Sequence, residues 1–376
     1  MKIVKSFTFS QFGLENRKPW FPSEEIKAEV YKKNPDFDIR YDSETFVYDV
    51  FFNAGTLYIL MPHYMDWEKV EYLLDHFLIA GKKLRDMAHE EFHNGVIVKF
   101  QIPLIENTTV EFSSIQFIPS DYSESSFSNK KILYTLQKDN QIQWIQDYIK
   151  YYRDKFFIDA AIIYDNGSTL YTPDQLSRYL ENLGCKVIVF SMPFKYGPVG
   201  YLTGHWNSIY LQSAALEHVR YSFCSNNCIL FNVDIDELIY TRHDFDVINE
   251  LNKSNSAAIG FKGSWAYIHE SLSAKNYQDI RHSDHLYFES TLINDRSNQK
   301  YICDLGRLNP ATTLNTHDIH HNSSRESVVE IQNHDLARFY HFAALSRWGD
   351  GSGWGDDRKK FCNDANKEKP NIFFDL

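Results

Sequence analysis

The stretch "ILFNVDIDELIY", residues 229–240, joins an apolar segment to a cluster of acids. Five of its first seven residues are apolar, which is typical of a strand buried on both faces. Asp234, Asp236 and Glu237 then follow within four positions. Three carboxylates at the end of a core strand repel one another unless a cation lies among them. The stretch therefore predicts a core strand that ends in a cation-dependent site.

Strands and helices alternate in the sequence before this stretch. The pattern predicts strands at 131–137, 159–165, 185–192 and 229–233, and helices at 142–156, 172–184 and 208–222. Such alternation predicts right-handed crossovers and an α/β fold with a mainly parallel sheet flanked by helices. Ligands of such sheets bind beyond the carboxyl ends of the strands. Asp139, Asp165 and Asp234 all follow predicted strand ends, so we expect the site there.

Residues 1–125 differ in pattern and predict a separate β-rich accessory module. "ETFVYDVFFNAGTLYILMP" reads as two strands joined by a turn. A helix is expected next, because apolar residues recur at helical spacing at Val70, Leu73, Leu74, Phe77 and Leu78. The polar, Ser-rich segment 119–131 is the candidate boundary. We thus expect a main domain at 126–348, followed at 349–376 by a tail or lid rich in Gly and Trp.

The bulk composition limits the classes of function. The formal net charge is -11, so binding of DNA or RNA over a broad surface is not expected. An anionic ligand would need a bound metal or a few well-placed cations to offset that charge. The first residues lack the apolar core of a signal peptide, and no run approaches the roughly 18 apolar residues that span a bilayer. The five scattered cysteines predict reduced thiols in a cytoplasmic protein.

The D-x-D pattern of Asp234 and Asp236 predicts a divalent metal site. Side chains two residues apart on an extended segment point the same way, so both carboxylates can converge on one point. Neither has a Lys or Arg beside it in the sequence, and oxygen ligands favour Mg²⁺ or Mn²⁺. The alternative is purely structural, with the acids capping a turn and Glu237 beginning a helix.

An ordered set of motifs resembles the nucleotide-sugar glycosyltransferases of the GT-A fold, in particular the family-2-like and family-92 groups. The set runs from Trp144 in "WIQDYIKYY" through "YDNGS" (164–168) and Gln212 to "DIDE" (234–237). The later segments "KYICDLGRLNPATTLNTHDIHH" and "RFYHFAALSRW" resemble the late segments of that group more loosely. The likeness covers about residues 130–348 and implies a GT-A-type fold.

The resemblance also implies roles for individual residues. It implies a nucleotide site formed by Lys138, Asp139, Asp165, Asn166, Gln212, Asp234 and Arg307. It implies a Mn²⁺ or Mg²⁺ site formed by Asp234, Asp236, His317, His320 and His341. Each role has a structural alternative: Asp165 can form an Asx-turn with Gly167, surface cations can simply be solvated, and "HDIHH" can be a loop.

An inverting transfer needs a carboxylate that removes a proton from the acceptor hydroxyl. Glu270, Asp284 and Asp304 follow the metal strand and are the candidates, with Glu270 and Asp284 preferred. Trp265 and Tyr267 can form a platform on which a sugar stacks, although aromatic residues more often pack in a core.

The leading hypothesis is a hexosyltransferase that uses a UDP-sugar and a divalent metal to build a surface polysaccharide or another glycan. Lipid-linked acceptors would place the enzyme at the inner membrane face. One alternative is a sugar nucleotidyltransferase, although "LQKDNQIQW" lacks the Gly expected of a phosphate loop. The other is a glycan-binding protein with a decayed site, since "YDNGSTL" has lost the acid that usually ends this motif.

Overall fold

The structure is a computed structural model of the chain. It describes residues 2–19, 21, 23–62, 67–87, 89–91, 97–101, 108–122, 127–197, 210–224, 227–272, 275–289, 292, 299–309, 312–321, 324–325, 328–331, 333–342 and 345. The predicted tail at 349–376 lies outside the described residues.

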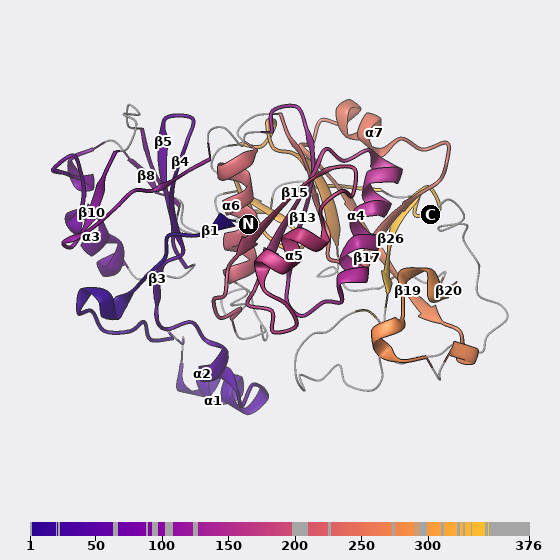
Figure 1. Cartoon of the computed structure of the whole chain (residues 1–376), viewed down its shortest axis with the longest axis horizontal. Helices are drawn as coiled ribbons and strands as arrows, with labels where there is room; N and C mark the ends of the chain where they lie inside the picture. The colour runs from indigo at the N-terminus through magenta and orange to yellow at the C-terminus, as the bar shows by residue number, and fades with distance from the viewer. Residues whose placement is uncertain are drawn as a thin grey trace.

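An eight-stranded sheet forms the centre of the molecule (Figure 1). Its strands, in spatial order, are β1 (Lys2–Ile3), β15 (Lys186–Ser191), β14 (Ala160–Asp165), β13 (Lys131–Gln137), β16 (Ile229–Asn232), β21 (Lys300–Asp304), β18 (Ala258–Phe261) and β25 (Val329–Glu330). The first five are parallel, and β21 runs antiparallel to β16 and β18. The predicted α/β fold with a mainly parallel sheet is confirmed.

Helices cover both faces of this sheet. On one face lie α4 (Ile142–Phe156) and α5 (Pro173–Tyr179), and on the other lies α6 (Tyr210–Phe223). The buried side of α4 is aromatic and includes Trp144, Tyr148 and Tyr152. Helix α5 begins as the sequence predicts, because the hydroxyl of Thr172 accepts a hydrogen bond from Gln175 N and Pro173 occupies the first turn.

A second, four-stranded sheet continues from the end of β16. Its order is β17 (Glu237–Thr241), β26 (Ala337–Phe342), β19 (Gly263–Ile268) and β20 (His285–Phe288). Glu237 thus begins a strand, not a helix. The remaining C-terminal elements are α7 (Val247–Lys253), the 3-10 turns at Glu270–Leu272, Tyr277–Asp279 and His282–Asp284, and a small sheet of β22 (Thr312–Leu314), β23 (Ile319–His321) and β24 (Ser324–Arg325).

The N-terminal part contains its own sheets. One is β12 (Ser120–Asp121), β4 (Asp49–Asn53), β5 (Thr56–Leu60), β9 (Ile97–Gln101) and β8 (His89–Glu91); another is β11 (Ile115–Phe117), β10 (Val110–Phe112), β6 (Phe77–Ile79) and β7 (Lys82–Lys83); β2 (Phe7–Thr8) pairs with β3 (Thr45–Val47). The helices are α1 (Glu24–Lys33), α2 (Phe37–Arg40) and α3 (Trp67–His76), with 3-10 turns at Phe9–Phe12 and Leu84–Asp86.

The end of helix α3 and the position of strand β1 bear on two expectations for this part. The helix predicted through Leu78 ends at His76, because the next residues form β6 and pair with β10. The three-part division of the chain stays a prediction. Strand β1 belongs to the large sheet, where Lys2 pairs with Phe190, so residues 1–125 are not separate from the main domain along their whole length.

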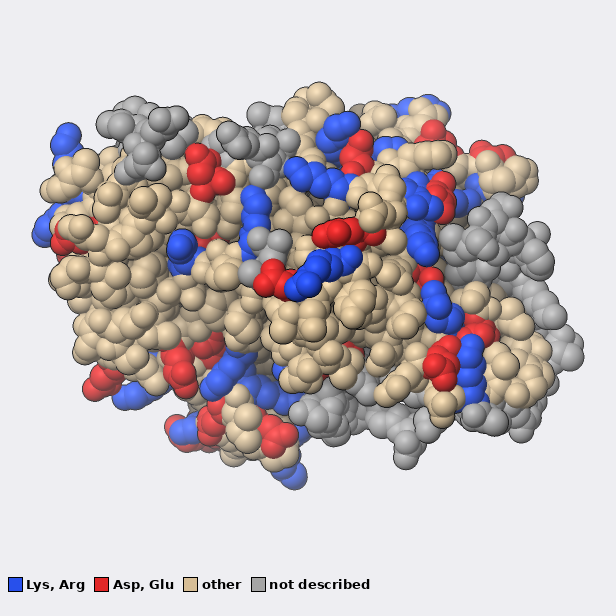
Figure 2. Space-filling model, viewed as in Figure 1, with Lys and Arg blue, Asp and Glu red and all other residues tan. Residues whose placement is uncertain are grey.

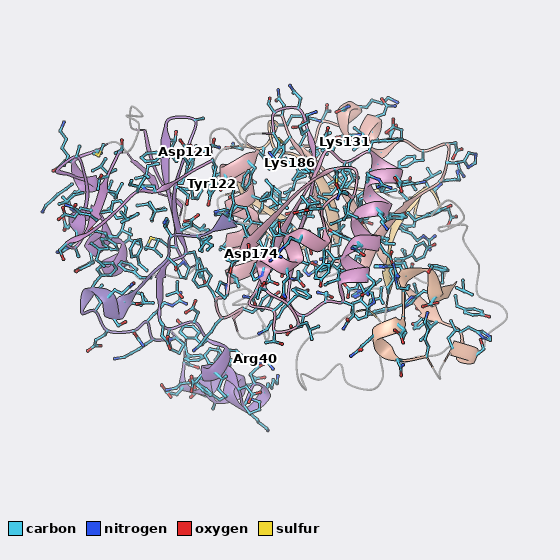
Figure 3. The ribbon with its side chains drawn as sticks, viewed as in Figure 1. Arg40, Asp121, Tyr122, Lys131, Asp174 and Lys186 are labelled. Carbon is cyan, nitrogen blue, oxygen red and sulfur yellow. The ribbon has the colours of Figure 1, made fainter. Side chains whose placement is uncertain are left out.

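A buried polar network connects the N-terminal sheet to the large sheet. Asp49 of β4 and His218 of α6 are fully buried, and Oδ2 of Asp49 lies 2.9 Å from Nε2 of His218. The hydroxyl of Tyr164 on β14 lies 2.7 Å from Nδ1 of the same imidazole. Tyr122 donates to Asp49 at 3.2 Å and lies where the two parts meet (Figure 3).

The surface is mixed in charge. On the face seen in Figure 2, Lys and Arg are interspersed with Asp and Glu and do not gather by sign. None of the helices in the described part of the chain has the length and apolar character needed to cross a membrane.

Candidate active site

The acids that follow β16 share a buried lysine. Lys300, the first residue of β21, is fully buried. Its Nζ lies 2.6 Å from Oδ2 of Asp234 and 3.1 Å from Oε2 of Glu237. The register explains the contact, because Asn232 on β16 pairs with Tyr301, next to Lys300. The sequence predicted a cation at this cluster and favoured a divalent metal. A lysine distant in the sequence supplies one positive charge there, and the metal stays a prediction.

The charge balance of this cluster follows from burial. Burial raises the pKa of Glu237 to about 7, although Lys300 acts to lower it. Burial would lower the pKa of Lys300, but Asp234 and Glu237 outweigh that effect, so the pKa of Lys300 is raised and the ammonium keeps its proton. A hydrogen bond of 3.0 Å from Asp234 N to Oε2 of Glu237 closes the turn between the strands. Asp234 and Lys300 therefore form a neutralised pair, and a metal-binding role for Asp234 stays a prediction.

Asp236 has a different partner. Its Oδ2 lies 3.0 Å from Nε2 of His341 on β26. In the antiparallel register, His341 pairs with Glu237, and Phe342 N donates to Asp236 O at 2.8 Å, which fixes the acid beside the imidazole. Burial would lower the pKa of His341, but the charge and hydrogen bond of Asp236 raise it overall. The imidazole also stacks on Trp265, with ring centroids 4.4 Å apart.

The Asp236–His341 pair fits a divalent cation. Two adjacent ligands of an octahedral ion with bonds of about 2.1 Å lie about 3.0 Å apart, and the two side-chain atoms are 3.0 Å apart. Among the side chains that the structure describes, no group of three or more His, Cys, Asp or Glu could hold a metal. Mg²⁺ commonly uses one or two protein carboxylates, with water and phosphate oxygens as further ligands. The pair is therefore suited to a cation that a phosphate-bearing substrate helps to hold.

The carboxyl ends of β13 and β14 meet beside this corner, and Asp165 organises them. Asp165 is buried, and its carboxylate accepts hydrogen bonds from Nε2 of Gln137, Oγ of Ser168 and Ser168 N. Burial raises its pKa, while the bonds from Ser168 act in the opposite direction. The structural role that the sequence allowed for Asp165 is thus present, and its predicted contact with a nucleotide would come in addition.

Neighbouring polar residues shape the same edge. Oδ1 of Asp139 accepts hydrogen bonds from the amides of Thr169 and Leu170, at 2.5 and 3.1 Å. Nδ2 of Asn166 donates to the carbonyls of Met192 and Phe194, at 2.9 and 2.7 Å. These bonds hold the loops after β13, β14 and β15 together.

Gln212 lies deeper, on α6. It is buried, and its Oε1 accepts a hydrogen bond of 2.5 Å from the hydroxyl of Tyr196. The hydroxyl of Tyr134 on β13 donates to the backbone carbonyl of Gln212 at 3.2 Å. Gln212 thus connects α6 to the segment that follows β15. Lys138, by contrast, is exposed just beyond β13.

Comparison with known families agrees with this geometry. Residues 134–372 match the profile of glycosyltransferase family 92, which is more than half of the chain. The chain belongs to glycosyltransferase family 92. The resemblance inferred from "YDNGS" and "DIDE" is thereby confirmed. No curated protein sequence matches the chain.

Solved structures give only distant matches for this family-92 protein. One is the galactosyltransferase LgtC in complex with donor and acceptor sugar analogs, at 13% identity over 47% of this chain and 58% of that chain, with a TM-score of 0.24. Another is glucosyl-3-phosphoglycerate synthase from Mycobacterium tuberculosis in complex with phosphoglyceric acid, at 14% identity over 46% of this chain and 56% of that chain, with a TM-score of 0.24. The chain thus spans little more than half of these proteins, and similarity this low says nothing about their sites.

All site residues predicted from the sequence lie within the family-92 match, but not all lie at one edge. The guanidinium of Arg307 donates to the carbonyls of Leu251 and Ser254. Arg307 follows Asp304, which pairs with Ile229 at the amino end of β16. Arg307 and Asp304 are therefore separated by the length of β16 from the corner at Asp236, so the structure does not bring them to the site.

The other candidates also differ in position. His317 lies near the corner, with its Nδ1 3.1 Å from the carbonyl of Gln299, the residue before Lys300. Oδ2 of Asp284 accepts from Nζ of Lys275 at 2.5 Å and from Arg281 N at 2.7 Å, which stabilises a 3-10 turn. The side chains of His320 and Glu270 lie outside the described residues.

Lys300 lies at this corner but was not predicted from the sequence. A signal existed, because Lys300 opens the apolar segment "KYIC", and a charged residue at the start of a buried strand needs a partner. The partner of Lys300 follows from the pairing of β21 with β16, and only the fold shows that pairing.

Proposed function

We propose that this family-92 protein is a metal-dependent hexosyltransferase that transfers a sugar from a nucleotide-diphosphate donor, UDP-linked, to a glycan acceptor with inversion. The observation that supports this best is the Asp236–His341 pair, set at the carboxyl edge of the parallel strands with cation-compatible spacing. That edge is where α/β sheets bind their ligands.

The residues at this edge have separate roles in the proposed reaction. Asp236 and His341 would hold Mn²⁺ or Mg²⁺, which at that position supplies positive charge to a diphosphate and eases departure of the nucleotide. Lys300 supplies one positive charge to Asp234 and Glu237, and burial raises the pKa of Glu237 to about 7, so less negative charge opposes an anionic donor. Asp165 and Asp139 hold the neighbouring loops in place for the nucleotide.

Asp236→Asn tests the proposal. Release of UDP from UDP-hexoses is measured with Mn²⁺ and with a chelator. We expect the wild type to require Mn²⁺ and the variant to fall at least about 100-fold, because a neutral amide is a poor ligand for a hard cation. Asp244→Asn is the matched control, since Asp244 is exposed and paired with Arg242.

The outcomes separate two parts of the proposal. Wild-type turnover that is as fast in chelator as with Mn²⁺ would reject the metal and leave Lys300 and His341 as the only cations of the corner among the described residues. If the wild type released UDP from no UDP-hexose under any condition, the transferase activity with this donor class would be rejected.

A further inference from the structure

A row of side chains crosses the second sheet and leads away from the Asp236–His341 pair, called here the metal corner because it is the proposed metal site. Glu237 on β17 pairs with His341 on β26, and His341 pairs with Trp265 on β19. Glu289 N donates to the carbonyl of Trp265 at 2.9 Å, so Glu289 continues the row just past the end of β20. Cross-strand neighbours point to the same face of a sheet. The row thus runs from the metal corner to a second carboxylate.

The far part of this row is aromatic and polar. Tyr267 pairs with Tyr287 on the same face, and the hydroxyl of Tyr267 donates to Oε1 of Glu289 at 2.8 Å. We call Trp265, Tyr267, Tyr287 and Glu289 the β19–β20 face. Trp265, Tyr287 and Glu289 are each partly exposed. The rings of Trp265, Tyr267 and Tyr287 form a small cluster of their own, apart from the main hydrophobic core.

The opposite side of the same strands is built as core. Ala266 pairs with Phe288 on one side and Phe342 on the other, and all three are buried. Strand alternation therefore places a packed apolar layer beneath and a partly exposed aromatic layer above. The aromatic layer is not needed to fill the interior, which raises the question of what it contacts.

Trp265 occupies the centre of the face. The imidazole of His341 covers one side of the indole, with an angle of 23° between the rings. On the side of Trp265 away from β26, the cross-strand neighbour is Glu289. At about 4.8 Å per strand, Glu289 lies about 10 Å along the sheet from His341. A saccharide ring that packs on the exposed part of Trp265 would lie close to both the Asp236–His341 pair and the carboxylate of Glu289.

We infer that the β19–β20 face is the acceptor subsite and that it binds a saccharide ring. Sugar rings present apolar C–H faces that pack on aromatic rings, and their hydroxyls donate to carboxylates. Trp265 supplies the stacking surface, and Glu289, oriented by Tyr267, accepts hydrogen bonds from the hydroxyls. The inference rests on the proposed function, because it places the acceptor next to the donor held at Asp236 and His341.

Saccharide binding can be measured without a donor. Saturation-transfer NMR is recorded with the methyl glycosides of galactose, N-acetylglucosamine, fucose and mannose as probes. We expect saturation of at least one probe by the wild type, loss of that signal in Trp265→Ala, and partial recovery in Trp265→Phe. Tyr179→Ala is the matched control, because Tyr179 is 52% exposed on α5, outside this sheet. Melting temperatures show whether each variant is folded.

Transfer to the probe that binds supplies the second readout. For Glu289→Gln, we expect the acceptor KM to rise about tenfold, with a smaller change in kcat and a lower ratio of transfer to donor hydrolysis. A folding defect would lower both reactions together.

The results test the saccharide subsite separately from the proposed transferase activity. Equal saturation of a probe by the wild type and Trp265→Ala, or no saturation of any probe, would overturn the subsite. Release of UDP without saccharide binding would leave the proposed function standing and the inference rejected. Saccharide binding that depends on Trp265, without UDP release, would reject the donor assignment and retain the saccharide site.

Discussion

Lys300 supplies a positive charge at the acidic cluster where the sequence predicted a cation. It is a fully buried ammonium in contact with two carboxylates, and it allows β16 and β17 to bring acids together at a core edge. Buried ion pairs of this kind depend on both partners, because removing one leaves an uncompensated charge.

Lys300→Met should therefore be strongly destabilising. We expect the free energy of unfolding to fall by about 3–5 kcal/mol, because the buried Glu237 and the partly buried Asp234 would remain without their cation. Urea unfolding at neutral pH measures it. Lys262→Met is the control, since Lys262 pairs with Glu330 at the surface and its loss should cost less than about 1 kcal/mol. Similar losses in both variants would contradict the ion-pair account.

Tyr152 is the second residue with a specific structural task near the site. Its hydroxyl accepts a hydrogen bond from Ile239 N at 2.9 Å and donates to Glu237 O at 3.2 Å. Tyr152→Phe should lower the free energy of unfolding by about 1–3 kcal/mol, because a buried amide loses its acceptor. Tyr31→Phe, which removes an exposed bond to Asp38, should have little effect. Equal urea midpoints for the two variants would show that the bond to β17 is unimportant.

At the scale of elements, the segment around β20 contains two buried histidines. Burial lowers the pKa of His282, and it lowers the pKa of His285 to about 3. His285 faces the carbonyl of Arg281 and the ring of Phe342, and His282 and Asp284 act on it electrostatically. An imidazole that is neutral when folded takes up a proton on unfolding below its ordinary pKa of about 6.5.

Acid should therefore destabilise the protein through this element. The stability that neutral His285 contributes is complete above pH 6.5 and is lost as the pH falls from there toward 3. Between pH 7.5 and 5.5 we expect a loss of about 1 kcal/mol from His285. His285→Asn removes this group, so its unfolding free energy should depend less steeply on pH over that range. An unchanged slope in urea titrations at the two pH values would contradict the prediction.

The elements also show what the sequence could and could not predict. The strands β13, β14, β15 and β16 and the helices between them follow from hydrophobic periodicity, which local residues determine, although the helix expected at 172–184 already ends at Tyr179. The helix expected through Leu78 failed in its last turn, because pairing with β10 outweighed local spacing. At the site, the resemblance implied a shared metal for Asp236 and His341, which stays a prediction, and the structure places their side chains 3.0 Å apart. The contact of Lys300 with Asp234 was not predicted, because it depends on a strand pairing between distant segments.

At the scale of the whole molecule, part of the N-terminal region shares a buried cluster with the large sheet, and the rest of that region has a cluster of its own. Phe51 and Tyr58 of the N-terminal part pack in the same buried cluster as Leu216 and Val219 of α6 and Ile162 of β14. The Asp49–His218 contact lies within this shared region, and Figure 1 shows α6 between the two parts.

Thermal unfolding should accordingly show one transition. Because β4 and β5 contribute side chains to the cluster that also contains α6, loss of packing in one part exposes apolar surface of the other, and the calorimetric and van't Hoff enthalpies should agree. Asp49→Asn should lower the midpoint of that single transition without splitting it. Two separated transitions in the wild type would instead indicate independently stable parts.

The placement of β1 has a consequence for how the chain is made. Lys2 and Ile3 complete an edge of the large sheet by pairing with Phe190 and Ser191. During synthesis, this edge strand must remain without its partner until β15 has left the ribosome, and domains with such remote pairings fold slowly. A bulky tag joined directly before Lys2 would hinder the late pairing of β1 with β15. It should therefore lower the soluble yield more than a tag placed elsewhere on the surface.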